Sequence, residues 1–174
     1  MKEWIKDIAI AAVIAFVILQ FIKPTIIKES SMEPNFYENN YMLINKQSYR
    51  MHQPERGDVV VFHSSLVQEN GKEKMLIKRV IGLPGDVIDI KEGMVYINGE
   101  MLTESYTKDG ITTGEIEGLK VPEGEFFCMG DNRLVSKDSR SPEVGCIRED
   151  DIIGKVFIRL FPFNKIGLVK NPFA

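Results

Sequence analysis

The sequence predicts a mainly β domain that follows a single membrane-spanning helix. Residues 8–22 read IAIAAVIAFVILQFI, an uncharged apolar run in which Gln20 is the one polar residue. Beyond this run the chain changes to short stretches rich in Val, Ile, Phe and Tyr, separated by turn signals such as PGD at 84–86 and NG at 98–99. Its 174 residues suffice for one compact domain and a small appendage.

We interpret residues 8–22 as a transmembrane signal anchor and residues 1–7 as a short cytoplasmic amino terminus. The run shows no polar face at helical spacing, which argues against a buried core helix. The sequence QFIKP at 20–24 offers no small-x-small site, which argues against a cleaved secretory signal. A helix over residues 8–22 rises about 22 Å, less than the roughly 30 Å hydrocarbon core, so Lys6 and Lys23 would have to snorkel.

Residues 23–174 are predicted to form an all-β domain. The sequence DVIDIKEGMVYING at 86–99 predicts a hairpin, and IIGKVFIRLF at 152–161 predicts a long late strand. Residues 100–124 are richer in Thr, Gly and charge than their flanks, so we interpret them as an inserted lobe rather than as core.

Composition and spacing exclude several function classes. A formal net charge of -3 provides no broad basic field of the kind that holds a phosphate backbone, so nucleic acid is not an expected partner. Cys128 and Cys146 are not spaced as C-x-x-C, and neither His52 nor His63 begins an H-E-x-x-H. We therefore expect no metal and no small-molecule cofactor. A disulfide between the two cysteines stays open, with free thiols as the preferred interpretation.

The stretch ESSMEPNF at 29–36 places Ser30 and Ser31 side by side just after the apolar run. A serine that acts as a nucleophile needs a base for its proton, yet no G-x-S-x-G motif occurs and neither histidine has a recognisable partner nearby in sequence. A lysine can replace histidine where burial keeps its amine neutral near pH 7. The candidate base therefore has to lie within apolar sequence.

Lys78 meets this condition. In KMLIKRVIG the alternation of a strand places Leu76, Lys78 and Val80 on one face and Arg79 on the other. A charged Lys78 would be costly there, whereas Arg79 has too high a pKa to lose a proton. The alternative is an edge-strand lysine whose stem lets the ammonium reach water.

The chain carries four motifs in order: SMEP at 31–34, RGDVVVF at 56–62, IKRVIGLPGD at 77–86 and MGDNRLVSKDSR at 129–140. Together they resemble the successive sequence boxes of type I signal peptidases, particularly the short single-anchor enzymes of Gram-positive bacteria. The resemblance extends from the anchor to IIGKVFIRLFPF at 152–163, nearly the whole chain. It implies a signal-peptidase-type catalytic domain, a coiled antiparallel β-sheet, behind one transmembrane helix.

The resemblance also implies roles for individual residues. Ser31 matches the family's nucleophile, Lys78 its general base, and Ser136 the serine that normally hydrogen-bonds and orients that lysine. The charged positions of the last box are expected to pair with one another or with Arg79 and to be structural; they are Asp131, Arg133, Asp138 and Arg140. Met32 and Pro34 match residues that shape the turn and the substrate floor.

The implied function is that of a membrane-bound serine endopeptidase that removes signal peptides from secreted preproteins after a small-x-small motif. Its expected partners are the cleavage regions of these preproteins and the lipid bilayer. Because translocated precursors have to be cut on the far side of the membrane, residues 23–174 are expected on the extracytoplasmic side of the cell membrane. The alternative is a non-proteolytic signal-peptidase-like factor for surface protein or pilus assembly; such factors lack catalytic residues.

Glu29 departs from the family pattern, in which glycine or a hydroxyl-bearing serine precedes the nucleophile by two residues. An ionised carboxylate can only accept hydrogen bonds, so it would repel a developing oxyanion if it pointed inward. We therefore expect an active Ser31 with an unusual substrate preference.

Overall fold

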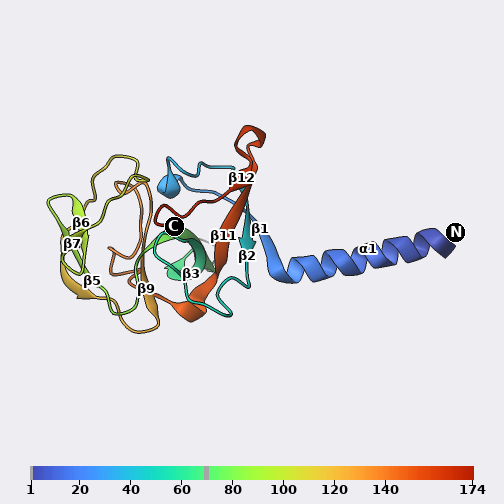
Figure 1. Ribbon diagram of the computed structural model, residues 1–174, viewed down its shortest axis with the longest axis horizontal. Helices are drawn as coiled ribbons and strands as arrows, with labels where there is room; N and C mark the ends of the chain where they lie inside the picture. The colour runs from blue at the N-terminus through green and yellow to red at the C-terminus, as the bar shows by residue number, and fades with distance from the viewer. Residues whose placement is uncertain (1, 69–70) are drawn as a thin grey trace.

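One helix projects from a β body in the computed structural model, which describes residues 2–68 and 71–174 (Figure 1). Helix α1 (Lys2–Phe21) rises about 30 Å, the thickness of the hydrocarbon core. Its window Trp4–Phe21 has a mean hydropathy of 2.0, and none of that window is buried. The helix thus begins earlier than the predicted apolar segment, and its first turns include the charged residues Lys6 and Asp7. It ends before Pro24, which disfavours helical geometry in the preceding residue.

The main sheet has eight strands, and all of its recorded pairings are antiparallel. Its order is β1-β2-β11-β3-β4-β9-β10, with β12 paired to β11. The strands are β1 (Ile22–Ile26), β2 (Tyr41–Asn45), β3 (Val59–Val67), β4 (Glu73–Gly82), β9 (Glu125–Met129), β10 (Ile147–Arg148), β11 (Ile152–Phe161) and β12 (Gly167–Leu168). The predicted mainly antiparallel β fold with one amino-terminal helix is confirmed, and the predicted late strand is β11.

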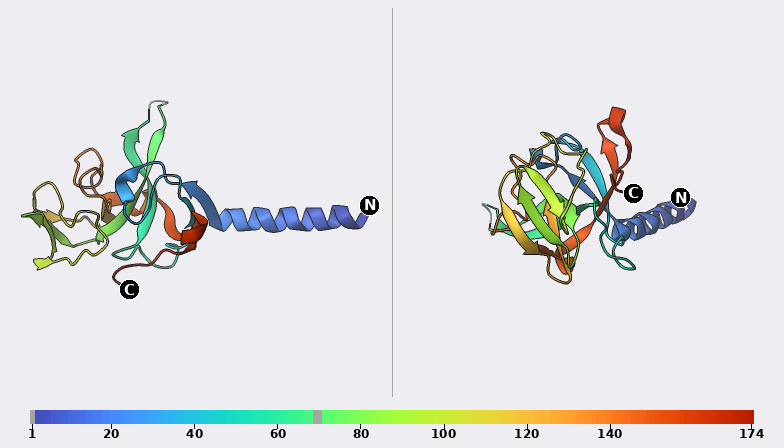
Figure 2. Two further views of the ribbon diagram at one scale, coloured as in Figure 1. Left: turned by 90° about the horizontal axis from the view of Figure 1, so that it is seen from above. Right: turned by 60° about the vertical axis from the view of Figure 1, so that its left-hand side comes forward.

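A second, four-stranded sheet lies at the end of the domain remote from α1 (Figure 2). Its order is β7-β6-β5-β8, with strands β5 (Val87–Lys91), β6 (Met94–Ile97), β7 (Glu100–Met101) and β8 (Ile116–Lys120). Strands β5 and β6 form the predicted hairpin, whose two turn residues, Glu92 and Gly93, both have positive φ. The second sheet therefore takes strands both from this hairpin and from residues 100–124.

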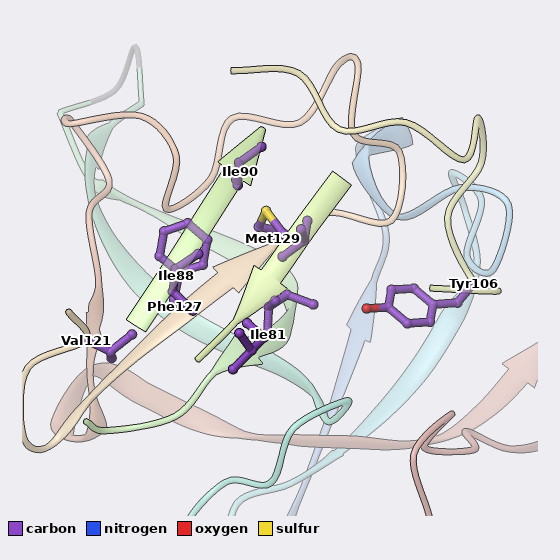
Figure 3. Close-up of a cluster of buried hydrophobic side chains, with 9 residues drawn as sticks. Ile81, Ile88, Ile90, Tyr106, Val121, Phe127 and Met129 are labelled. Carbon is purple, nitrogen blue, oxygen red and sulfur yellow. The ribbon is translucent and has the colours of Figure 1, made fainter. Parts of the chain in front are cut away.

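Three buried clusters form the core. Alternate residues of β3 divide between two of them, with Val59 and Val61 in one and Val60 and Phe62 in the other, as expected when both faces of a strand are covered. The third joins the two sheets: Figure 3 shows Ile88 of β5 close to Phe127 of β9. This third cluster fixes the second sheet against β4 and β9, the strands that lead into the predicted site residues.

Both cysteines are free thiols, as preferred from the sequence. Cys128 packs with Phe126 and Ile147, whereas Cys146 packs against the cluster that contains Phe127. Because Phe126 and Phe127 point to opposite faces of β9, the two thiols lie on opposite sides of the sheet.

Candidate active site

Ser31 lies at the centre of a short 3-10 turn, η1 (Ser30–Met32), which follows β1. The side chain of Ser31 is 5% exposed. Met32, which is fully buried, packs with Ile27 and Phe36 in the cluster beneath the turn. The turn is thereby anchored to the core, which limits the movement of the Ser31 hydroxyl. The two other 3-10 turns, η2 (Glu149–Asp151) and η3 (Phe163–Lys165), lie elsewhere in the chain.

Asn132 binds two backbone carbonyl oxygens of the same turn. The Asn132 N–H donates to the carbonyl oxygen of Ser31 at 3.0 Å, and Asn132 Nδ2 donates to the carbonyl oxygen of Ser30 at 3.1 Å. Sequence reasoning missed this residue, because a side chain that bonds backbone atoms about a hundred residues away leaves no periodic pattern. Its place inside the motif MGDNRLVSKDSR is the one signal that pointed to it.

Lys78 reaches from β4 to Ser31. Lys78 Nζ lies 2.7 Å from Ser31 Oγ, and the lysine side chain is 1% exposed. Leu76 and Val80, its neighbours on the predicted face, pack together in one cluster, whereas Ile77 packs against another. Because the lysine is 1% exposed, the alternative in which its ammonium reaches water is wrong.

Burial disfavours the charged form of Lys78 and lowers the pKa of its ammonium to about 8. The carboxylates of Asp138, Glu29 and Asp131 act in the opposite direction, and the Lys74 ammonium adds to the lowering. A lysine base has to be neutral, so its capacity to take a proton falls as pH drops through about 8 and rises above it. The buried serine and the amine beside it can therefore carry out nucleophilic acyl transfer.

Arg79 points away from Lys78 and forms a buried ion pair with Asp131. Arg79 Nε donates to Asp131 Oδ1 at 2.8 Å, and Arg79 Nη2 donates to Oδ2 at 2.6 Å. Asn35, which sequence reasoning also missed, donates from Nδ2 to Asp131 Oδ2 at 2.8 Å. The Arg79 guanidinium lies 4.4 Å from the centre of the Tyr106 ring. Bidentate pairing of this kind ties β4 to the loop that follows β9.

The remaining charged residues of the last motif also pair. Arg140 Nε donates to Asp138 Oδ1 at 2.8 Å. Burial by itself would raise the pKa of the Asp138 carboxyl, but Arg140 and the Gly130 N–H together hold it below its usual value. Arg133 pairs instead with Glu104, which lies in residues 100–124 and was not predicted as its partner.

Ser136 lies close to the serine turn but forms no hydrogen bond to Lys78. Its Oγ is buried and lies near enough to the Asp138 carboxyl to help lower the pKa of that group, although it forms no well-aligned hydrogen bond among the described residues. The side chain is turned toward Gly130, where a Cβ would collide with Ser136 Oγ and lie 2.5 Å from the Ser31 carbonyl oxygen. Glycine is thus the residue that lets this loop approach the turn, and an orienting role for Ser136 stays a prediction.

The structure also places the residues around the turn. The Glu29 carboxylate forms an ion pair with Lys74 of β4. Met32 has no exposed surface, so it supports the turn from below, whereas Pro34 is exposed. Of the two predicted floor residues, only Pro34 reaches the surface.

We expect Asp131→Ala to lower the free energy of unfolding by about 3–5 kcal/mol, because the guanidinium of Arg79 would stay buried without its partner. Chemical unfolding of the full-length protein in detergent measures this. Asp150, in an exposed pair with Arg148, offers the matched control: Asp150→Ala should cost less than about 1 kcal/mol. An Asp131→Ala protein as stable as the parent would show that the buried pair does not hold the loop.

A serine beside a buried amine on an antiparallel β scaffold, carried behind one apolar helix, defines a class of membrane-anchored hydrolase. Comparison with known proteins narrows the class. The family model described as "Signal peptidase, peptidase S26" matches residues 1–161. Signal peptidase IB of Staphylococcus aureus (strain MRSA252) is 38% identical over 190 residues, which cover 99% of this chain and 95% of the relative.

Two further proteins are similar to this chain. Probable signal peptidase I-2 of Synechocystis sp. is 36% identical over 168 residues, which cover 95% of this chain and 76% of the relative. A crystal structure of a signal peptidase I from Enterococcus faecalis V583 is 31% identical and covers 59% of this chain and 96% of that one, with a TM-score of 0.49. The chain belongs to the signal peptidase family, peptidase S26, as a serine endopeptidase of the signal peptidase I type that cleaves signal peptides from secretory preproteins.

Proposed function

We propose that Ser31 is the nucleophile and Lys78 the general base of this signal peptidase, acting on preproteins at the membrane surface. The observation that carries the proposal is the separation of 2.7 Å between Lys78 Nζ and Ser31 Oγ, both on buried side chains. Hydrogen-bond reach between a nucleophile and its base is the first geometric requirement of general-base catalysis.

The proposed reaction proceeds in two halves. Neutral Lys78 takes the proton of Ser31, whose Oγ attacks the scissile carbonyl carbon. The Ser31 N–H, in the first turn of η1 where no intrahelical partner is available, supports the oxyanion. The Lys78 ammonium then protonates the leaving amine, which leaves an acyl-enzyme. In the second half Lys78 activates a water molecule that hydrolyses the ester.

The substrate proposed for this site is an extended segment that ends in a small-x-small motif. Among the described residues, β9 pairs with β4 only from Arg79 onward, so residues 73–78 present a free strand edge that leads to Lys78. Strand β1, which leads toward Ser31, pairs on one edge with β2. An extended peptide can add to such edges through main-chain hydrogen bonds, with side-chain pockets that exclude larger residues.

The proposed location is a single pass through the cell membrane, with residues 1–7 in the cytoplasm and residues 23–174 outside. The lipid bilayer is the second proposed partner, and nucleic acid is not one. The hairpin formed by β11, η3 and β12 lies on the side of the domain from which α1 leaves (Figures 1 and 2). Phe163 and Leu168, which belong to this hairpin, are exposed, and this supports bilayer contact. Aromatic and apolar side chains of this kind favour the membrane interface.

Cleavage of a purified preprotein tests this function. We expect the full-length protein in detergent to release a mature chain whose new amino terminus follows alanine in a small-x-small site. A preprotein that carries phenylalanine instead of that alanine should be cut at least about 100-fold more slowly, since a shallow pocket excludes the ring. The readouts are amino-terminal sequencing and kcat/KM. A folded protein that cuts no preprotein would favour the non-proteolytic assembly role.

A further inference from the structure

An ion pair joins the two segments that carry Ser31 and Lys78, in addition to the hydrogen bond between those two side chains. Glu29, two residues before Ser31, contacts the ammonium of Lys74, four residues before Lys78 on β4. An even spacing on a strand places Lys74 and Lys78 on the same face. The side chains of Lys74 and Glu29 are 36% and 44% exposed, so this pair lies at the rim of the site, above the buried dyad.

The charges that act on Lys78 come from three parts of the chain. The loop after β9 supplies Asp138 and Asp131, the segment before η1 supplies Glu29, and β4 itself supplies Lys74. On β3 the residue opposite Lys78 is the uncharged Val60, and on β9 the neighbouring titratable group is the buried Cys128 thiol.

The two aspartates differ from the rim pair in their partners. Asp138 is hydrogen-bonded to Arg140 and Asp131 to Arg79, so changing either aspartate would disturb the buried framework. Glu29 and Lys74 carry opposite charges, are partly exposed and pair with each other. They are the members of the set whose charge can be altered with the least structural cost.

We propose that Glu29 and Lys74 are positioning residues that together set the pH range in which Lys78 is neutral, with Glu29 favouring the ammonium and Lys74 opposing it. This inference rests on the proposed role of Lys78 as the base. A carboxylate near an ammonium stabilises its charged form, and a second ammonium destabilises it. In the pair the two effects largely cancel, and the loss of either partner exposes the effect of the other.

The pH dependence of kcat/KM tests the proposal, because its acidic limb reports the base of the free enzyme. The full-length protein in detergent would be compared with Glu29→Gln, Lys74→Gln and the double variant on one preprotein. We expect Glu29→Gln to move the limb to lower pH and Lys74→Gln to move it to higher pH, each by at least about 0.3 pH unit. On the acidic limb this corresponds to about a twofold gain and a twofold loss of kcat/KM. The double variant should return close to the parent.

Salt and a remote pair provide the controls. Both shifts should shrink as salt rises, since partly exposed charges are screened. Arg148→Gln and Asp150→Asn, which neutralise an exposed pair of β10 and η2, should leave the limb unchanged.

Three results would overturn the proposal: limbs that coincide in all variants, shifts of the same sign in both single variants, or a rate that changes equally at every pH. The last would mean that the pair only holds the turn, or that the new amide of Glu29→Gln donates to the oxyanion. Absence of cleavage by the parent itself would instead reject the proposed function.

Discussion

Replacing Ser31 by alanine is expected to reduce kcat/KM for preprotein cleavage by at least about 10⁴-fold, to the level left by substrate binding and oxyanion contacts alone. The substitution removes one buried hydroxyl and leaves the backbone of η1 free to keep its bonds to Asn132. A lower kcat/KM would therefore report the loss of the nucleophile rather than a loss of structure around it. Purified protein, a fixed preprotein and time-resolved gel analysis measure the change.

Ser30 provides the matched control for this experiment. It is adjacent in the same turn, and its recorded bond to Asn132 uses the carbonyl oxygen rather than the hydroxyl. Ser30→Ala should therefore keep kcat/KM within about threefold of the parent. If Ser31→Ala cuts as fast as the parent, or if Ser30→Ala is the inactive variant, the assignment of the nucleophile is wrong.

The second large effect is expected at the base. Lys78→Met should reduce kcat/KM by about 10³- to 10⁴-fold near pH 8, because no other described amine lies within hydrogen-bond distance of Ser31 Oγ. Methionine matches the length of the lysine stem and is apolar, so the buried position should tolerate it. In the parent, kcat/KM should rise with pH through an apparent pKa near 8, and Lys78→Met should lose this limb.

Lys137 gives the corresponding control, since it lies in the loop after β9 and forms an exposed pair with Glu143. Lys137→Met should retain the parental rate and the parental limb. A Lys78→Met protein that still cuts with the same pH dependence would show that another group removes the serine proton.

Local patterns predicted much of the fold. The β5–β6 hairpin was visible because its turn needs residues that accept positive φ, and Lys78 was visible because strand alternation is a local property. Strand β1 was not predicted: Ile22 was placed in the anchor, and β1 contains Pro24. This strand exists because β2 pairs with it, a partner about twenty residues away.

In the site, too, local sequence predicted some features, whereas others depend on distant parts of the chain. The motifs pointed to Ser31 and Lys78, and the structure brings the two together. Two other contacts join segments that are distant in sequence. Arg133 pairs with Glu104, and Asn132 hydrogen-bonds to the backbone of η1. Sequence spacing carries no record of such contacts, so the partners of Arg133 and Asn132 could be identified only once the chain was folded.

The position of β11 in the main sheet makes the geometry of the site depend on a distant part of the chain. This strand, formed by Ile152–Phe161, lies between β2 and β3, so it is the bridge between the half that carries Ser31 and the half that carries Lys78. Residues 152–161 therefore hold together two parts of the sheet to which they contribute no residue of the proposed pair. The separation of 2.7 Å between Lys78 Nζ and Ser31 Oγ depends in this way on a strand more than seventy residues from either side chain.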